Sequence, residues 1–471
     1  MAAVQRDFTR GPIARGMVAF SMPFLLSNVL QALYGAVDML VVGRYSAATP
    51  EMCAPILSGV NIGSQITHMV AMMVSGLTVS GTVLVGQYVG AKKQKDASET
   101  VGTMFTLLGI AGAVLTVLMI LLADPLLRLL NTPADAYEHA KTYLIICTCG
   151  TLFIFGYNAI SSIQRGLGDS VRPLIFVGVA CVVNVFLDLW LVKGKGMGAA
   201  GAAWATVIAQ GISLILAALY LSRNKFIFDF RMRSFRIHRD KMNLMIKLGI
   251  PSSVQSIIVN VSFLVMTAVV NGMGSLGYDA AKASGAVGVV GKFNSFAILP
   301  AVAMSSSVSA FAAQNIGAGK HERAKKSLYV GTVIALSISA VLFALVQIAP
   351  ETIVSIFNED PQVCAYGVEY IKTFSFDFLF VAVLFCCNGL IMGAGHTKFT
   401  LLTGSLSSLL LRIPVAVLFG KALGWGLSGV GLACPAASLI SLGLGVWFVA
   451  TGRWERDQTG IHAEAEETES C

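Results

Sequence analysis

A few ionisable side chains interrupt the long apolar runs of this sequence. Asp38, Asp188 and Asp377 each lie in a stretch that is otherwise largely apolar, and so does Arg412. An ionisable group near the middle of a bilayer costs several kcal/mol, so a chain that places one there generally uses it to bind a solute or to move a proton or ion. These residues are therefore the first candidates for a functional site.

Two groups of polar residues have a spacing that places each group on one face of a helix. Gln31, Tyr34 and Asp38 are three and four residues apart, and Asn184 and Asp188 are four apart. If both faces point inward, their oxygens can hold a proton or a dehydrated sodium ion, because hard cations prefer oxygen ligands. The alternative is that these side chains only join neighbouring helices through hydrogen bonds.

Asp377 and Arg412 carry opposite charges in neighbouring apolar runs. One interpretation is that they bind a solute. The other is that the two charges only neutralise each other inside the protein. The sequence leaves both interpretations open.

The composition indicates that membrane helices position these residues. Charged residues make up 12% of the chain and hydrophobic residues 55%, whereas roughly a quarter of a soluble domain is charged. A bilayer core requires about 20 apolar residues per helix. The sequence contains twelve such runs, at 17–42, 54–85, 97–122, 138–160, 171–192, 197–221, 243–271, 281–312, 325–348, 364–390, 398–420 and 428–450.

The two halves of the chain share a pattern at a distance of about 228 residues. Pro23 corresponds to Pro251, and the turn GMGAAG at 196–201 corresponds to GWGLSG at 424–429. The basic stretches VGQYVGAKKQKDASET and AAQNIGAGKHERAKKS correspond as well, and they begin at residues 85 and 312. Six spans per half keep both halves in the same orientation. We therefore predict an all-α integral membrane protein with two pseudo-symmetric six-helix bundles and a cleft between them.

The distribution of basic residues predicts the orientation. If the N-terminus is cytoplasmic, the basic residues of the outer connections are Arg44, Arg128, Lys193, Lys195 and Lys421, and most others are inside. The positive-inside rule thus predicts a multi-pass protein of the cell membrane with both termini in the cytoplasm. The predicted segments are an N-terminal segment at 1–16, lobes at 17–221 and 243–450, a basic cytoplasmic linker at 222–242 and a tail at 451–471.

Motifs for several other functions are missing or misplaced. The two glycine-rich turns match a dinucleotide-binding pattern, but they join predicted membrane helices and not a strand and a helix. The chain contains no phosphate-binding loop for ATP hydrolysis and no H-E-x-x-H or G-x-S-x-G motif of an enzyme. Its cysteines lack the spacing of a zinc site. We expect no enzyme activity, no cofactor, no nucleic-acid partner and no metal beyond a sodium ion.

The motifs taken together resemble the multidrug and toxic compound extrusion (MATE) family. They are VDMLVVGR at 37–44, GQYVGAKK at 86–93, QRGLGD at 164–169, NVFLD at 184–188 and GMGAAGAAWAT at 196–206, with AQNIGAGK and MGAGHTK in the second half. The resemblance runs from about Gly16 to Ala450. It implies a V-shaped, twelve-helix antiporter that exports organic cations or other amphipathic drugs in exchange for protons or sodium ions. We expect the ion gradient to be its energy source, and a monomer surrounded by membrane lipid.

The resemblance also implies site residues. Asp38, Asn184, Asp188 and Thr206 match the four positions of the cation site in family members. The predicted substrate cavity contains Gln31, Tyr34, Asn158, Asn260, Asp377 and Arg412. The second half departs from sodium-coupled relatives, because residues 254–267 contain no acid and Asp377 lies about one turn from the family position. We therefore expect ion coupling in the first half.

A second hypothesis is a lipid-linked precursor flippase of the wider superfamily. Such a protein would need a cleft rich in arginine to hold a pyrophosphate group. The cleft candidates here are mostly apolar, with Arg412 and Lys292 as exceptions. The antiporter is the favoured hypothesis.

Overall fold

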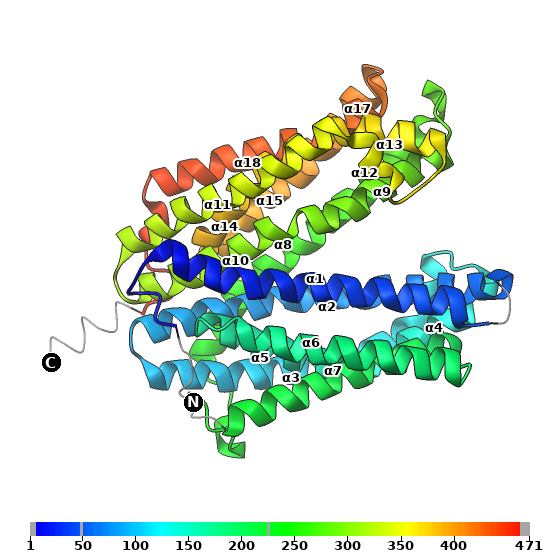
Figure 1. Cartoon of the computed structure of the whole chain (residues 1–471). Helices are drawn as coiled ribbons and strands as arrows, with labels where there is room; N and C mark the ends of the chain where they lie inside the picture. The colour runs from blue at the N-terminus through cyan, green and yellow to red at the C-terminus, as the bar shows by residue number, and fades with distance from the viewer. Residues whose placement is uncertain (1–5, 48–49, 224–226, 462–471) are drawn as a thin grey trace, which may run out of the picture. The chain divides into compact units, whose positions relative to one another are not determined.

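The computed structural model describes residues 6–47, 50–223 and 227–461, and within these ranges it contains helices and no strand. The helices of the first half are α1 (Ile13–Tyr45), α2 (Pro50–Gly90), α3 (Gln94–Leu129), α4 (Ala134–Cys149), α5 (Thr151–Gly166), α6 (Val171–Asp188) and α7 (Gly198–Arg223). Those of the second half are α8 (Arg239–Asn271), α9 (Ala280–Ala297), α10 (Leu299–Gly317), α11 (His321–Ile348), α12 (Pro350–Ser355), α13 (Pro361–Phe374), α14 (Phe376–Gly393), α15 (Thr397–Ser405), α16 (Ile413–Val415), α17 (Gly426–Gly431) and α18 (Ala433–Ala450). Three π-helical segments directly follow α6, α15 and α16 along the chain. They are η1 (Leu189–Gly194), η4 (Leu406–Arg412) and η5 (Ala416–Ala422). Figure 1 follows this order by colour.

Long apolar helices confirm the prediction of an all-α membrane protein. Among the described residues, eleven helical segments are long and apolar enough to cross a membrane, and α4 with α5 makes a twelfth if the bent pair is one span. A helix pairs its own backbone N–H and C=O groups, as a hydrocarbon environment requires. Most helices extend a few residues beyond the apolar runs, because a helix can continue into the polar region of the bilayer.

Four of the predicted spans divide into two α-helices each. Those at 281–312 and 428–450 divide at Ile298 and Leu432 and still form single spans, whereas two others do not. The span predicted at 138–160 divides at Gly150 into α4 and α5, which meet at an angle of 49°. The span predicted at 364–390 divides at Ser375 into α13 and α14. A Cβ atom at Gly150 would come within 2.5 Å of the Val207 side chain, so α7 packs directly against the first bend. Hydropathy did not predict either break, since both sides of each break are mainly apolar.

The chain forms two compact units, and the boundaries between them fall inside two helices. One unit contains Leu26–Gly249, and the other combines Phe8–Leu25 with the chain from Ile250 onward. The first turns of α1 therefore belong to the second unit, and the first turns of α8 belong to the first unit. Pro23 and Pro251 lie next to these boundaries, where the missing proline N–H interrupts the helical hydrogen bonds.

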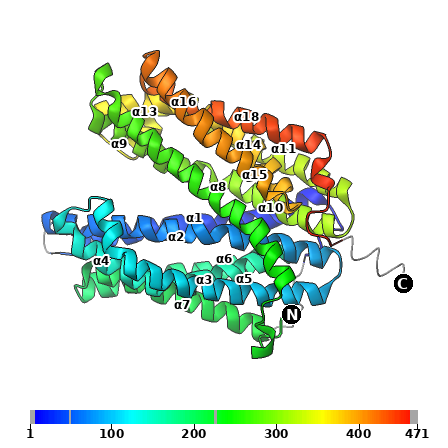
Figure 2. The same cartoon turned by 180° about the vertical axis from the view of Figure 1, so that it is seen from behind.

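Each unit repeats one packing scheme. In the first unit, α4 and α5 pack on α2, α3 packs on α5, and α7 packs on both α4 and α5. In the second unit, α13 packs on α9, α10 and α11 pack on α14, and α18 packs on α14. These helices are labelled from behind in Figure 2. The internal repeat of the sequence is therefore also a repeat of helix contacts.

Glycines allow the central helices of each unit to touch. A Cβ atom on Gly166 of α5 would lie 2.8 Å from the Thr82 carbonyl oxygen of α2. A Cβ atom on Gly393 of α14 would lie 2.6 Å from the Ser309 carbonyl oxygen of α10. Gly166 and Gly393 occupy corresponding positions in the two halves, and small residues are how membrane helices bring their backbones together.

The first copy of the repeated basic stretch holds the beginning of α8. The Lys241 side chain is buried, and its Nζ atom lies 2.6 Å from Asp96 Oδ1 and 3.1 Å from the Tyr88 hydroxyl oxygen. The Thr103 hydroxyl group accepts a hydrogen bond from the His238 backbone N–H at 3.1 Å. Because Tyr88 and Asp96 belong to the basic stretch, this stretch and the start of α3 anchor α8 in the first unit.

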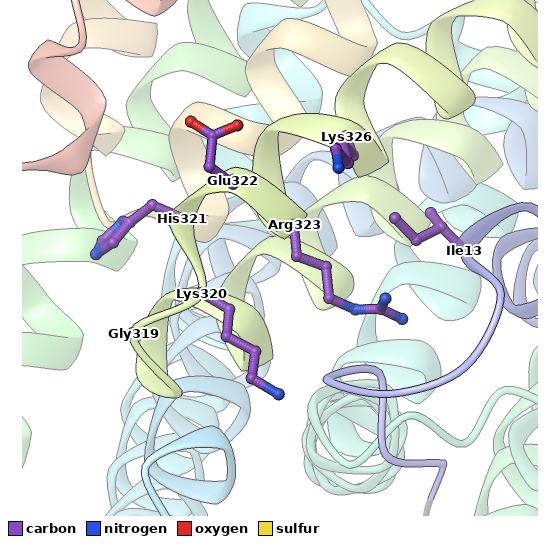
Figure 3. Close-up of a pocket in the computed structure, with 7 residues that line it drawn as sticks. All are labelled: Ile13, Gly319, Lys320, His321, Glu322, Arg323 and Lys326. Carbon is purple, nitrogen blue, oxygen red and sulfur yellow. The ribbon is translucent and has the colours of Figure 1, made fainter.

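The second copy holds the segment before α1 in a comparable way. The Phe8 N–H donates to Gln314 Oε1 at 3.0 Å, and the Asn315 amide donates to the Phe8 carbonyl oxygen at 3.2 Å. Arg323 and Lys320 donate to backbone carbonyls of the same segment. Both side chains also line the pocket drawn in Figure 3. These basic residues therefore also hold the N-terminal segment through hydrogen bonds.

Each copy of the basic stretch thus holds the start of the first helix of the other half of the sequence. The lobes predicted at 17–221 and 243–450 do not include this exchange, because they divide the chain between its repeats. An exchange of this kind depends on contacts between residues that are far apart in the sequence, so no local pattern predicts it.

Replacing Gly393 with Ala should lower the thermal stability of the purified protein in detergent. The added Cβ atom would meet the Ser309 backbone carbonyl, which cannot rotate away, so α14 and α10 must separate. Overpacking of this kind costs about 1–3 kcal/mol. Gly443→Ala on α18 is the matched control, because a Cβ atom there meets nothing within 4 Å. Equal midpoints of thermal unfolding for the two variants would contradict the assigned contact.

Candidate cation-binding site

Three helices of the first unit bring four polar side chains together. Asp38 comes from α1, Asn184 and Asp188 come from α6, and Thr206 comes from α7. Asn184 and Asp188 share one face of α6 because four residues make about one helical turn. The chain then reverses at Gly196, whose φ of 65° is in the left-handed region that favours glycine. This reversal returns α7 beside α6.

The Asp38 carboxylate is the centre of this group. Asn184 Nδ2 donates to Asp38 Oδ1 at 3.4 Å, and the Thr206 hydroxyl group donates to Asp38 Oδ2 at 3.2 Å. Asp38 is 6% exposed and Asn184 is 1% exposed. Both hydrogen bonds are longer than the usual 2.7–2.9 Å or so of a bond to a carboxylate. These two hydrogen bonds therefore only partly replace the hydrogen bonds to water that Asp38 loses on burial.

Asp188 adds a second buried carboxyl group within hydrogen-bonding reach of Asp38. Its side chain is fully buried, and neither of its oxygens has a hydrogen-bond donor among the described residues. The Asn184 Oδ1 atom also lacks a donor. Buried polar atoms without a partner cost free energy. Either a proton shared by the two carboxyl groups or a cation bound by these oxygens would remove that cost.

The charges around the site favour a positively charged ligand. None of the ion pairs between described residues includes Asp38 or Asp188. Two adjacent carboxylates repel each other when both are ionised, so the pair favours binding one proton or one cation. The oxygens that are present fit a sodium ion, because hard cations prefer carboxylate, amide and hydroxyl oxygens.

Apolar side chains surround the site and keep its dielectric constant low. The buried cluster beside it contains Val41, Val42, Val60, Tyr143, Cys147, Val192, Ala199, Ala202 and Ala203. Electrostatic interactions are stronger in such surroundings than in water. A bound cation would therefore interact strongly with the two carboxylates.

Two neighbours of the site were missed by the sequence analysis. Gln210 of α7 donates its side-chain N–H to the Tyr34 hydroxyl oxygen at 3.4 Å. Thr206 and Gln210 are four residues apart, and this spacing could have indicated that they share a face. Tyr143 of α4 interacts electrostatically with Asp38. No signal in the sequence links these last two residues, because only the bend between α4 and α5 and the packing of α4 on α2 and α7 bring Tyr143 there.

The predicted substrate-cavity residues divide between the two units. Gln31, Tyr34 and Asn158 belong to the first unit, and Asn260, Asp377 and Arg412 belong to the second. Gln31 is exposed, whereas Tyr34 and Asn158 are half-buried. The Asn260 amide donates to the Ser256 carbonyl oxygen of its own helix at 2.8 Å. Their role in a cavity stays a prediction.

Asp377 and Arg412 are both buried in the second unit. Within the described part of the chain they form no ion pair with each other or with any other residue. The interpretation of a direct structural salt bridge therefore has no contact to support it. The two side chains do interact electrostatically.

The described residues contain no cluster of three or more histidine, cysteine or acidic side chains that could hold a metal ion. The eight cysteines in the described ranges are all free thiols. Five of them are fully buried inside the helical units. They act there as small apolar side chains in the packing of the helices.

Known proteins match this chain over almost its whole length. A family model described as MatE matches it twice, over residues 23–190 and 251–418. The probable multidrug resistance protein YpnP of Bacillus subtilis is 30% identical over 460 residues, which cover 95% of this chain and 97% of that protein. The probable multidrug resistance protein YoeA of the same organism is 28% identical and covers 93% of this chain and 94% of its own length.

The fold also matches a solved structure. It is described as the outward-facing conformation of a multidrug resistance MATE family transporter of the MOP superfamily. The match has a TM-score of 0.87 and covers 96% of this chain and 98% of that one, at 19% sequence identity. At this identity the match establishes a common fold.

Replacing Asp188 with Asn should raise the midpoint of thermal unfolding of the purified protein at neutral pH. The amide keeps the shape of the side chain, removes one of two like charges and supplies an N–H donor for Asp38. Thr206→Val, which removes a donor from Asp38 without changing the side-chain volume much, should lower the midpoint by the equivalent of about 1–2 kcal/mol. If both substitutions lower stability equally, the two acids do not repel each other.

Proposed function

The chain belongs to the MatE family of membrane transporters, and from this premise we propose that it is a secondary antiporter. It exports organic cations or other amphipathic drugs in exchange for protons or sodium ions. As a member of a transporter family it is not an enzyme, and the gradient of the coupling ion is its only energy source. The observation that carries this proposal is the pair of buried carboxyl groups, Asp38 and Asp188, which form no ion pair with a basic residue in the described ranges.

Two curated relatives support the substrate class. Both are named as probable multidrug resistance proteins, and together they cover more than nine tenths of this chain. Drugs of this kind share an apolar body and a charged or polar group. In this proposal, Gln31, Tyr34 and Asn158 of the first unit contact the polar group of the drug.

Competition for the carboxyl groups couples the two flows. When Asp38 and Asp188 hold a proton or a sodium ion, the buried charge of the site is lower and its acceptor atoms have a partner. A cationic drug prefers the state in which the carboxylates are free, because their charge then attracts it. Coupling requires only that each ligand binds one conformation better than the other, and a shared pair of carboxylates produces that difference.

Asn184 and Thr206 position Asp38 in this mechanism. Their hydrogen bonds fix both oxygens of the carboxylate relative to α6 and α7. When the proton or sodium ion leaves, these donors are the ones that remain for the ionised side chain. A change of charge at Asp38 therefore changes the force between α1 and its neighbours in the first unit.

The proposed topology places both termini in the cytoplasm of a multi-pass protein of the cell membrane. It rests on the excess of Lys and Arg in the even-numbered connections and at both ends of the chain. The linker at 222–242 is then cytoplasmic, between lobes at 17–221 and 243–450. The protein functions as a monomer in this proposal.

Purified protein in proteoliposomes tests the antiport. An imposed proton or sodium gradient should drive movement of ethidium, a fluorescent organic cation, and the gradient that works identifies the coupling ion. Asp38→Asn should reduce gradient-driven movement at least tenfold, because the amide cannot be protonated or carry a negative charge.

Asp124→Asn is the matched control. Asp124 pairs with Lys141 at 2.8 Å, and its side chain is 46% exposed, so the same acid-to-amide change there leaves the buried site intact. The control should transport like the wild-type protein. Undiminished exchange by the Asp38→Asn protein would rule out coupling through this residue.

A further inference from the structure

We propose that the second unit contains a binding site for an anionic group, and that Arg412 is the residue that recognises it. The ligand is an amphipathic organic anion with a carboxylate or phosphate group. The site lies at the place in the second unit that corresponds to the candidate cation site of the first. This inference extends the proposed function to a second substrate class.

The internal repeat places Arg412 at the position of Asn184. The two matches to the family model begin at residues 23 and 251 and end at 190 and 418, so both ends are 228 residues apart. The glycine turns keep the same distance, and Gly196 and Gly424 have nearly equal φ angles of 65° and 69°. Gly166 and Gly393 are 227 residues apart, and the turns at Gly196 and Gly424 are 228 apart. With the distance of 228 that applies at these turns and at both ends of the family match, Arg412 corresponds to Asn184, a member of the candidate cation site.

The other positions of the cation site carry no acid in the second unit. Met266, Ala416 and Cys434 correspond to Asp38, Asp188 and Thr206. Two acids have thus become apolar residues, and an amide has become a cation. These four positions thus carry one positive charge and no acid, which favours a negatively charged ligand.

The contacts of Arg412 leave part of its guanidinium group available. Its Nη1 atom donates to the Ser262 hydroxyl oxygen at 2.8 Å, and its Cζ atom lies 4.5 Å from the centre of the Phe263 ring. The Nε atom is buried and has no hydrogen-bond partner in the described structure. A guanidinium group binds a carboxylate or phosphate through N–H groups that have no other acceptor, and the Nε–H of Arg412 has none among the described residues.

Burial makes an anion at this place favourable. Arg412 is only 7% exposed, and a buried cation without a counter-ion is costly in free energy. The Phe263 ring next to the guanidinium is 38% exposed, so this ring reaches the surface of the unit. Met266, Ala416 and Cys434 belong to a buried apolar cluster of the second unit. An anion with an aromatic or aliphatic body fits these surroundings better than a fully hydrated one.

Asp377 carries a negative charge that should weaken the binding of an anion near Arg412, although Asp377 forms no ion pair with Arg412 in the described part of the chain. It is 8% exposed, and its Oδ1 atom has no hydrogen-bond partner among the described residues. Its electrostatic interaction with Arg412 offsets part of the positive charge. A bound anion must therefore overcome repulsion from Asp377, and removal of that charge should strengthen anion binding.

Equilibrium binding to the purified full-length protein in detergent tests the proposal. Isothermal titration calorimetry at constant pH and ionic strength would compare benzoate and phenyl phosphate with benzamide, which has the same ring and no charge. At least one anion should bind tenfold or more tightly than benzamide. Arg412→Gln should remove that preference, and Asp377→Asn should increase the affinity for the anion several-fold. The preferred anion identifies the group that the site recognises.

Arg453→Gln is the matched control for loss of an arginine from an aromatic ring. Arg453 also lies 4.5 Å from a ring centre, that of Trp447, but its side chain is exposed. This variant should bind the anion like the wild-type protein. If Arg412→Gln does not fold, the Asp377→Asn variant still tests the sign of the effect. A residue pair with a purely structural role would not give opposite changes of affinity.

The proposal is overturned if neither anion binds better than benzamide, if Arg412→Gln keeps the preference, or if Asp377→Asn weakens binding. No ion gradient is used in these measurements. A failure here therefore leaves the antiport at Asp38 untouched, and a failure of antiport leaves the anion site untouched.

Discussion

A carboxylate that is removed from water must obtain hydrogen bonds or a cation from its new surroundings. This requirement at Asp38 determines how the helices at the centre of the first unit are arranged. Donors come from Asn184 on α6 and Thr206 on α7. Helix α6 must therefore present its Asn184 face to α1, and the glycine turn before α7 must return that helix alongside. The bend between α4 and α5 lets α7 pack closely, and apolar side chains fill the remaining space.

One scaffold carries two different distributions of charge. The helix contacts of the first unit recur in the second, and so do the close approach at Gly166 and Gly393 and the left-handed turns at Gly196 and Gly424. These positions depend on the backbone and tolerate few residue types. At the polar positions of the candidate cation site the two halves carry different residues. Repetition therefore preserved the geometry and allowed the chemistry of each half to change.

The fold was largely predictable from the sequence, because the hydrocarbon core of a membrane requires long apolar runs. Apolar runs of sufficient length located the membrane helices, and spacing by four placed Asn184 and Asp188 on one face. The meeting of Asp38 with Thr206 was implied by a family resemblance and not by spacing. Contacts such as that of Lys241 with Asp96 join distant segments through tertiary packing. No local pattern encodes them, and the exchange of the first turns of α1 and α8 was missed for the same reason.

That exchange has a consequence for the order in which the protein can assemble during translation. The docking place of α8 includes Asp96, which precedes Lys241 by 145 positions and has already been synthesised when α8 leaves the ribosome. The N-terminal segment is in the opposite situation, because Phe8 binds Gln314, which follows it by 306 positions. The segment around Phe8 therefore lacks this partner until the second half of the chain has been made. A chain released early, before the second basic stretch is made, would leave the beginning of α1 without its native contacts, however complete its first unit is.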